Sequence, residues 1–477
     1  MINHIYLFKP TPPFFDIFIF STVLYISKTN GAFMNDKQSL IQALKNTHQK
    51  VVDLINTLSN SELSMPYHAG VNPPLWEIGH AAFFFEVFIL KPLDKKESYN
   101  PEMDDIWDSF NIDHKDRWIA GMIPSKENTL NYVNAIHQSI LTRIETKELT
   151  QDDLYLYKYS IFHQNMHVES LIWARQTMGY QKMVFDQPSN KDIPLGTETL
   201  TGDAEIPAGR YLIGMPANSK HFASDDFAFD NEKPSFEIDM DSFQISKTLV
   251  SNQEFVEFIE DGGYENEALW SWGGKKWLRT KQDTAIPPEK NKALPKHPLY
   301  WRQENNQWLE RHFDEWKPLV AEFPVTHVSY WEVEAFCTWA GRRLPTEHEW
   351  EVAALGNIKG KELRKFPWGN TMDANKVDMD GQHLAHIPVS AYPDGDSIFG
   401  CRQMLGTVWE WTSSQYLPYA GFSVDMYVFM STLQFGYHKT TKGGSCATSS
   451  ILIRGSYRQA YLPHRTDVFV GFRTCAL

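Results

Sequence analysis

The sequence predicts two domains of different fold class, an N-terminal bundle of four α-helices and a C-terminal α+β domain of low regularity. The chain has 477 residues, which is too long for one ordinary hydrophobic core. Apolar residues recur with helical spacing as far as Gly179. Beyond that point short strand-like pieces alternate with capped helices and with Trp, Gly and Pro. We therefore expect the bundle at residues 34–180, a linker at 181–202 and the second domain at 203–477.

Composition excludes several classes of protein. Apolar residues make up 42% of the chain, which is typical of folded proteins. The formal charge of −14 argues against a nucleic-acid surface and against an anionic membrane. The four cysteines show no C-x-x-C spacing, so neither a zinc ribbon nor a disulfide framework is expected. We expect a cytoplasmic protein.

Residues 1–33 do not match the rest of the chain. The apolar run at residues 14–26 is shorter than the ~20 residues that a membrane span needs. Lys9 before it and the small pair Gly31-Ala32 after it fit a signal peptide, but the nearby prolines and Asp16 disfavour one. We favour an upstream extension, with Met34 as the natural start.

Four amphipathic helices are expected in the first domain. The second begins at Asn72-Pro73-Pro74, with Asn72 as the N-cap, and the third opens at Pro124-Ser125. Between these two helices lies an aromatic-rich segment that predicts a loop at residues 99–123. The four helices are expected over residues 36–58, 72–92, 124–144 and 150–179.

The fourth helix carries two histidines that share one face. His163 and His167 lie four residues apart, so both imidazoles can point to one place inside the bundle. His80 lies on the inward stripe of the second helix and is a candidate third ligand. Such a group suits a borderline transition metal, although core histidines with satisfied hydrogen bonds are an equally simple explanation. Gln164 stands where a metalloprotease H-E-x-x-H motif requires Glu.

In the second domain, strand-like pieces are expected at residues 210–215 and 235–245. Helix starts are predicted by three capping boxes, Ser251-x-x-Glu254, Ser329-x-x-Glu332 and Thr346-x-x-Glu349.

Several short sequence motifs of the second domain resemble those of a known family. They are GRRLPTEHEWE at residues 341–351, FPWG at 366–369, GTVWEWT at 406–412, GGS at 443–445 and VGFR at 470–473. Residues 203–477 resemble the formylglycine-generating-enzyme (sulfatase-modifying factor) fold, which is related to C-type lectin domains. Formylglycine generators need two cysteines after the GGS phrase, where this chain has Thr448 and Ile453. We therefore expect no thiol–copper chemistry, and we interpret Cys446 as a small packing residue.

The first domain resembles a DinB-type four-helix bundle. The phrases LWEIGH at residues 75–80 and HQNMHVE at 163–169 match those of enzymes that fuse such a bundle to the second fold. These are the iron-dependent sulfoxide synthases of ergothioneine and ovothiol biosynthesis and the related selenoneine synthases. The resemblance implies Fe(II) bound by His80, His163 and His167. It also implies O2-dependent C–S or C–Se bond formation at the imidazole C2 of hercynine or another histidine derivative.

The same resemblance assigns further residues. Tyr427 aligns with a tyrosine that donates a proton to the reduced oxygen, and Gln164 is expected beside the imidazole substrate. Gln459 and Tyr461 align with an Asn-Trp-Asp segment that handles both substrates in ergothioneine enzymes. Loss of the acid at Tyr461 argues against gamma-glutamylcysteine and favours another thiol or a selenosugar, and residues 227–233 look like the selenoneine branch. Arg117 is a candidate for binding a carboxylate, with a solvated surface arginine as the alternative.

Glu169 is expected to orient a ligand or to close a helix contact.

Two functions of other classes stay open on sequence alone. One is a DinB-like metal-dependent thiol transferase with a lectin-like binding domain, which would turn over without O2. The other is a noncatalytic ligand-binding protein.

Overall fold

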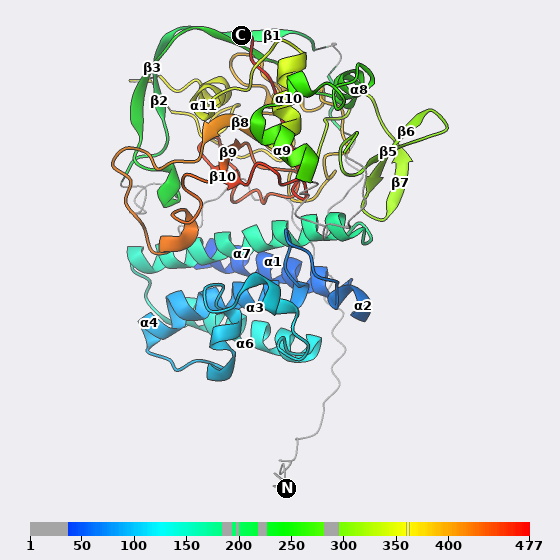
Figure 1. Ribbon diagram of the computed structural model, residues 1–477. Coiled ribbons are helices and arrows are strands. Elements are labelled where there is room, and N and C mark those ends of the chain that lie inside the picture. The colour runs from blue at the N-terminus through cyan, green and yellow to red at the C-terminus, as the bar shows by residue number, and fades with distance from the viewer. Residues whose placement is uncertain are drawn as a thin grey trace.

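The computed structural model describes residues 37–183, 193–196, 200–217, 227–280, 295–358, 360–361 and 363–477. Residues 1–33 and much of the predicted linker lie outside the described residues. Figure 1 shows a layer of helices below and an α+β domain above, with the long helix α7 (Gln151–Met178) running along the boundary. The predicted fold class, a helical bundle followed by a sheet-containing α+β domain, is confirmed.

The bundle is built from four long helices whose positions agree with the periodicity of the sequence. Ser125 caps the third helix, as its place before the first apolar stripe predicts. The predicted loop at residues 99–123 instead contains three short helical turns. The helices of the bundle are α1 (Lys37–Asn56), α2 (Asn60–Leu63), α3 (Pro74–Phe85), η1 (Glu86–Leu90), α4 (Lys91–Asp94), η2 (Pro101–Met103), α5 (Asp104–Trp107), η3 (His114–Trp118), α6 (Lys126–Thr146) and α7.

The predicted N-cap of α3 is wrong. Pro73 occupies that position, and no side chain caps the helix. The amide of Asn72 is engaged elsewhere: its Nδ2 donates to Glu77 Oε2 at 2.5 Å, and its Oδ1 accepts from Arg117 at 2.5 Å. A carboxylate and a guanidinium both hold this side chain, because they form stronger hydrogen bonds than a backbone amide does.

Helix α7 is buried on both faces. Thr150 and Asp153 form a capping box at its start, and Gly179 ends it in the left-handed conformation with φ 67°. One face packs against α1 and α3, and the other lies against the second domain (Figure 1). Polar residues such as Asn165, Glu169 and Gln176 are therefore buried along with the apolar stripe.

The second domain contains small sheets rather than one large one. The four-stranded sheet has the order β10-β9-β8-β11, with β8 and β11 parallel. The predicted strand at residues 235–245 is two strands in two different sheets, and the exposed pair Asp241-Ser242 lies between them. The strands are β1 (Asp203–Ile206), β2 (Gly209–Ile213), β3 (Phe236–Met240), β4 (Phe243–Ser246), β5 (Trp301–Glu304), β6 (Gln307–His312), β7 (Glu315–Pro318), β8 (Trp409–Gln415), β9 (Lys439–Lys442), β10 (Arg458–Tyr461) and β11 (Val470–Gly471).

The three predicted capping boxes are confirmed, each with both of its reciprocal hydrogen bonds. They start α8 (Asn252–Glu260), α10 (Tyr330–Trp339) and α11 (Glu347–Leu355), while α9 (Trp272–Thr280) has no such box recorded. The remaining short helical turns are η4 (Asp230–Glu232), η5 (Glu267–Leu269), η6 (Pro393–Gly395) and η7 (Val428–Met430). Among the described residues, no helix combines the length and the apolar character needed to cross a membrane.

Candidate metal centre

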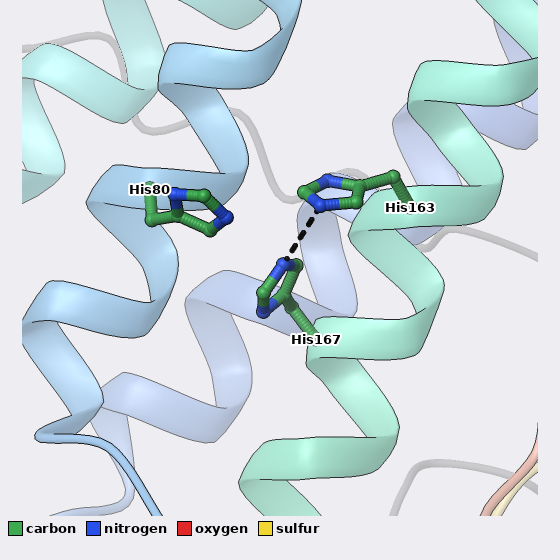
Figure 2. A group of neighbouring side chains, drawn as sticks. All are labelled: His80, His163 and His167. Carbon is green, nitrogen blue, oxygen red and sulfur yellow. Dashed lines mark hydrogen bonds between the residues drawn. The ribbon is translucent and has the colours of Figure 1, made fainter. Parts of the chain in front are cut away.

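Three imidazoles from two helices meet inside the bundle. His80 projects from α3, and His163 and His167 project from successive turns of α7 (Figure 2). One ring nitrogen from each lies within 4.8 Å of the other two. The ring centroids are 5.4 Å apart for His80 and His163, 4.9 Å for His80 and His167, and 4.4 Å for His163 and His167. The structure therefore brings the three predicted ligands together.

The orientation of His80 is fixed by Trp107. The carbonyl oxygen of Trp107 lies 2.7 Å from His80 Nδ1, which leaves Nε2 as the lone-pair nitrogen. This close approach depends on Gly79, because a Cβ there would lie 2.4 Å from the Trp107 ring. On the other side, Trp76 stacks on His80 with centroids 4.8 Å apart and planes 7° apart.

The orientation of His167 is fixed by Glu77, a residue to which sequence reasoning assigned no role. Its Oε1 lies 2.8 Å from His167 Nδ1. Burial raises the pKa of Glu77, but the interaction with His167 and the hydrogen bonds from Ser170 and Asn72 outweigh it and lower the pKa to about 2. Glu77 precedes His80 by three residues and so shares its face of α3, which is the signal in the sequence that could have revealed it.

The donor set fits a metal ion. Burial lowers the pKa of His80 to about 3 and that of His163 well below its usual value, so both rings are neutral. His163 Nε2 lies only 3.2 Å from His167 Nε2 (Figure 2), where two lone pairs would repel unless a cation or a proton lies between them. His163 Nδ1 has no hydrogen-bond partner in the part of the chain that the structure describes. Neutral, converging imidazoles are suitable ligands for Fe, Zn, Ni or Cu.

Tyr427 lies beside this group. Its ring centroid is 6.3 Å from that of His163 and 5.2 Å from that of Phe84, which itself stacks on His163 at 3.9 Å. Burial raises the pKa of Tyr427 to about 12, partly offset by a hydrogen bond with Ser109. The phenol is thus protonated at neutral pH, as a proton donor must be.

Arg117 is not the solvated surface residue considered as an alternative. It is 9% exposed, and its guanidinium carbon lies 3.6 Å from the ring centroid of Trp76. Burial lowers its pKa to about 10, although the nearby Glu77 acts in the opposite direction. The side chain covers the outer face of the Trp76–His80 stack and holds Asn72 against Glu77.

Gln164 lies on α7 between the two histidines and is 3% exposed. Its Oε1 has no hydrogen-bond partner among the described residues. A buried amide oxygen without a partner is costly, so this group is available to a ligand.

Gln459 and Tyr461 lie farther along the domain boundary, on β10. Gln459 Nε2 donates to the hydroxyl of Tyr457 at 3.3 Å. Tyr461 packs against Trp173 of α7 with ring centroids 6.2 Å apart, and burial holds its pKa well above the usual value. Neither has a recorded hydrogen bond or ring contact with the three histidines in the described structure.

Glu169 joins the two domains instead of orienting a ligand. Its carboxylate accepts hydrogen bonds from Trp409 Nε1 at 2.9 Å, Ser445 Oγ at 2.6 Å and Thr448 Oγ1 at 2.9 Å. All three donors belong to the second domain, and Glu169 is 3% exposed.

Comparison with known proteins agrees with this architecture. Residues 193–476 match the sulfatase-modifying factor enzyme 1-like domain, and residues 43–173 match the DinB superfamily. The chain belongs to the sulfatase-modifying factor family. Its relatives include an inactive C-alpha-formylglycine-generating enzyme 2 of Bos taurus, which is 32% identical over 48% of this chain and 75% of that protein.

Other relatives match both domains. A hercynine oxygenase of Mycolicibacterium smegmatis is 29% identical over 92% of this chain and 98% of that protein. A hercynine oxygenase of Mycobacterium tuberculosis is 29% identical over 92% and 99%, respectively. The resemblance predicted from the sequence phrases is thereby confirmed, since the same pair of domains is present in the same order.

In this chain, other residues stand where formylglycine generators have their two cysteines. Thr448 donates to Glu169, and Ile453 is buried in the core. Cys446 is fully buried, as a packing residue would be, and burial raises its pKa well above the usual range.

Proposed function

We propose that this protein is a non-heme Fe(II) oxidoreductase that joins a sulfur or selenium donor to the imidazole C2 of hercynine, with O2 as the oxidant. His80, His163 and His167 would hold the iron, which would supply the activation of O2. The observation that carries the proposal is the convergence of three imidazoles, each with a ring nitrogen within 4.8 Å of the other two, of which His80 and His163 are neutral. The relatives described as hercynine oxygenases indicate the substrate.

The overall reaction balances with these three reactants. The C2–H bond of the imidazole and the S–H or Se–H bond of the donor are broken, and a C–S or C–Se bond is formed. One oxygen atom goes to the sulfur or selenium, giving a sulfoxide or selenoxide. The other leaves as water with the two hydrogens, so the substrates lose the four electrons that O2 gains.

Tyr427 is the proton donor in this proposal. Its phenol is protonated at neutral pH and lies in the first layer of side chains around His163. Gln164 would accept a hydrogen bond from the imidazole of the substrate with its unpaired Oε1.

The class of donor substrate is proposed from two residues of β10, Gln459 and Tyr461. Tyr461 is buried among aromatic rings and carries no negative charge, so it cannot form an ion pair with the amino group of gamma-glutamylcysteine. A donor without that requirement, such as a selenosugar or a simple thiol, fits this surface better, and Gln459 offers it an amide. Arg117 would act behind the site rather than on the substrate, because its guanidinium is held between Trp76 and Asn72.

An aerobic assay tests the proposal. Protein loaded anaerobically with Fe(II) is mixed with hercynine and one donor at a time, and products are identified by mass spectrometry. The expected product is hercynine bonded through C2 to sulfur or selenium, with one oxygen from 18O2. His137→Ala, which alters a stacked histidine pair elsewhere in the bundle, serves as the control for iron loading. Tyr427→Phe should lower kcat by about 100-fold or more.

Turnover at the same rate without O2 would contradict the proposal and favour the thiol transferase. Protein that retains no metal after reconstitution would contradict both enzymes and leave a noncatalytic ligand-binding protein.

A further inference from the structure

Residues 227–233 form a buried segment rich in charge. Asp230, Glu232 and Lys233 are 0%, 0% and 5% exposed, which is unusual for charged side chains. The segment packs against α7, where the rings of Phe227 and Phe162 have centroids 4.6 Å apart. Charges are buried at this cost only when each has a specific partner.

Two of the three charged residues bind the loop that carries Tyr427. Lys233 Nζ donates to Asp425 Oδ2 at 2.6 Å. Asp230 Oδ1 accepts from Ser431 Oγ at 2.7 Å. The two loop residues lie on either side of Tyr427, two positions before it and four positions after it.

The loop has buried anchors and an exposed apex. The side chain of Asp425 and the whole of Ser431 are 0% exposed, whereas Val428 and Phe429 between them are 43% and 38% exposed. Tyr155 of α7 adds a second hydrogen bond to Asp425 Oδ2, at 2.7 Å. Between the anchors, only the short turn η7 provides regular structure.

We propose that residues 227–233 are a positioning segment for Tyr427, holding its loop at both ends so that the phenol stays beside His163. Asp230 and Lys233 are positioning residues and do not touch the reacting groups. The inference rests on the proposed role of Tyr427. It assigns a structural role to residues 227–233, which the sequence marked only by a family resemblance. A phenol displaced by about 1 Å would lose much of its catalytic value.

The third charged residue provides a matched control. Glu232 Oε2 accepts from Ser456 Oγ at 2.7 Å, the same distance as that between Asp230 and Ser431. Ser456 is also buried, at 4% exposure, but it lies outside the Tyr427 loop. Ser431→Ala and Ser456→Ala therefore each remove one serine hydroxyl donor from neighbouring carboxylates of one segment, and Glu232 keeps its ion pair with Arg454.

Hydrogen–deuterium exchange and kinetics on the full chain test the proposal together. Ser431→Ala should speed amide exchange across residues 424–431 by tenfold or more and lower kcat about tenfold, with KM for hercynine within twofold of wild type. Ser456→Ala should leave both the amide exchange of residues 424–431 and kcat close to their wild-type values. A tenfold loss in kcat corresponds to about 1.4 kcal/mol of transition-state stabilisation.

Unchanged exchange in Ser431→Ala would overturn the proposal, as would an equal effect of Ser456→Ala on the loop. If the wild-type chain shows no turnover of hercynine, the proposed function fails, but the exchange comparison still decides whether the segment holds the loop.

Discussion

At the scale of single residues, the site depends on groups behind the imidazoles as much as on the imidazoles themselves. Glu77 holds His167, and the Trp107 carbonyl holds His80. Each of these acceptors fixes which ring nitrogen presents a lone pair to the centre. The geometry of the three rings is therefore set before any ion binds.

Glu77→Gln should weaken Fe(II) binding by about 10- to 100-fold while leaving the fold intact. The amide keeps the size of the side chain but loses the charge that orients and polarises His167. An anaerobic Fe(II) titration measures the effect.

Glu86→Gln is the matched control, because Glu86 is equally buried in the same bundle but accepts hydrogen bonds from Tyr99 N and Tyr132. Equal Fe(II) affinities for the Glu77 and Glu86 variants would contradict a role for Glu77 in holding the ligand.

The histidines could be predicted from the sequence, but the long-range contacts of their supporting residues could not. A spacing of four residues on one helix is visible in the chain itself, and it indicated His163 and His167. Arg117 reaches Trp76 and Asn72 from a segment 41 to 45 residues away, and no local pattern specifies that contact. Glu77 shares a helix face with His80, yet nothing local indicates that its partner is on α7.

At the scale of secondary-structure elements, α7 belongs to both domains at once. It carries two histidines on one side and presents Glu169 to Trp409, Ser445 and Thr448 on the other. The metal centre is therefore attached directly to the sheet domain through one helix.

Glu169→Ala should destabilise the protein by about 3 kcal/mol or more, because three buried donors would lose a charged acceptor. Equilibrium unfolding in urea measures the change. Glu145→Ala provides the control, since Glu145 is exposed on α6. A Glu169→Ala variant as stable as the control would contradict the role of this carboxylate in joining the domains.

Helix positions were predictable because capping and periodicity are local. The three capping boxes of the second domain and the limits of α7 follow from residues within one turn of each other. The division of residues 235–245 into β3 and β4 was not predictable, because it depends on pairing with β2 and β1. Tertiary context decides strand pairing.

At the scale of the whole molecule, the far end of α7 meets β6 and the neighbouring loop. Gln176 Oε1 accepts from the backbone amide of Phe313 at 2.5 Å, and Arg311 donates to the carbonyl oxygen of Thr177 at 3.1 Å. The adjacent His312 stacks on His386 with ring centroids 3.7 Å apart. The pairing of the two domains was predictable from sequence motifs. The two hydrogen bonds were not, since each joins residues more than 130 positions apart.

The buried His312 predicts that the stability of the protein depends on pH. Burial lowers the pKa of His312 to about 2, and the nearby His386, Lys182 and Lys317 act in the same direction. The unfolded chain takes up a proton below pH ~6.5 while the folded chain does not, so stability falls as the pH falls below that value. Well below pH ~6.5 the loss from this residue approaches about 1.4 kcal/mol for each pH unit.

His312→Gln should therefore reduce the difference in unfolding free energy between pH 7 and pH 5.5 by about 1.4 kcal/mol. Urea unfolding at the two pH values measures it. The same difference in the variant and in wild type would show that His312 does not remain neutral in the fold.

The most direct test of the whole account is the number of Fe(II) ions bound per chain, measured by anaerobic equilibrium dialysis. The account predicts one ion for wild type and none for His80→Ala, His163→Ala or His167→Ala. His137→Ala, which alters a stacked histidine pair elsewhere in the bundle, should still bind one ion. One ion per chain in any of the three ligand variants would contradict the account.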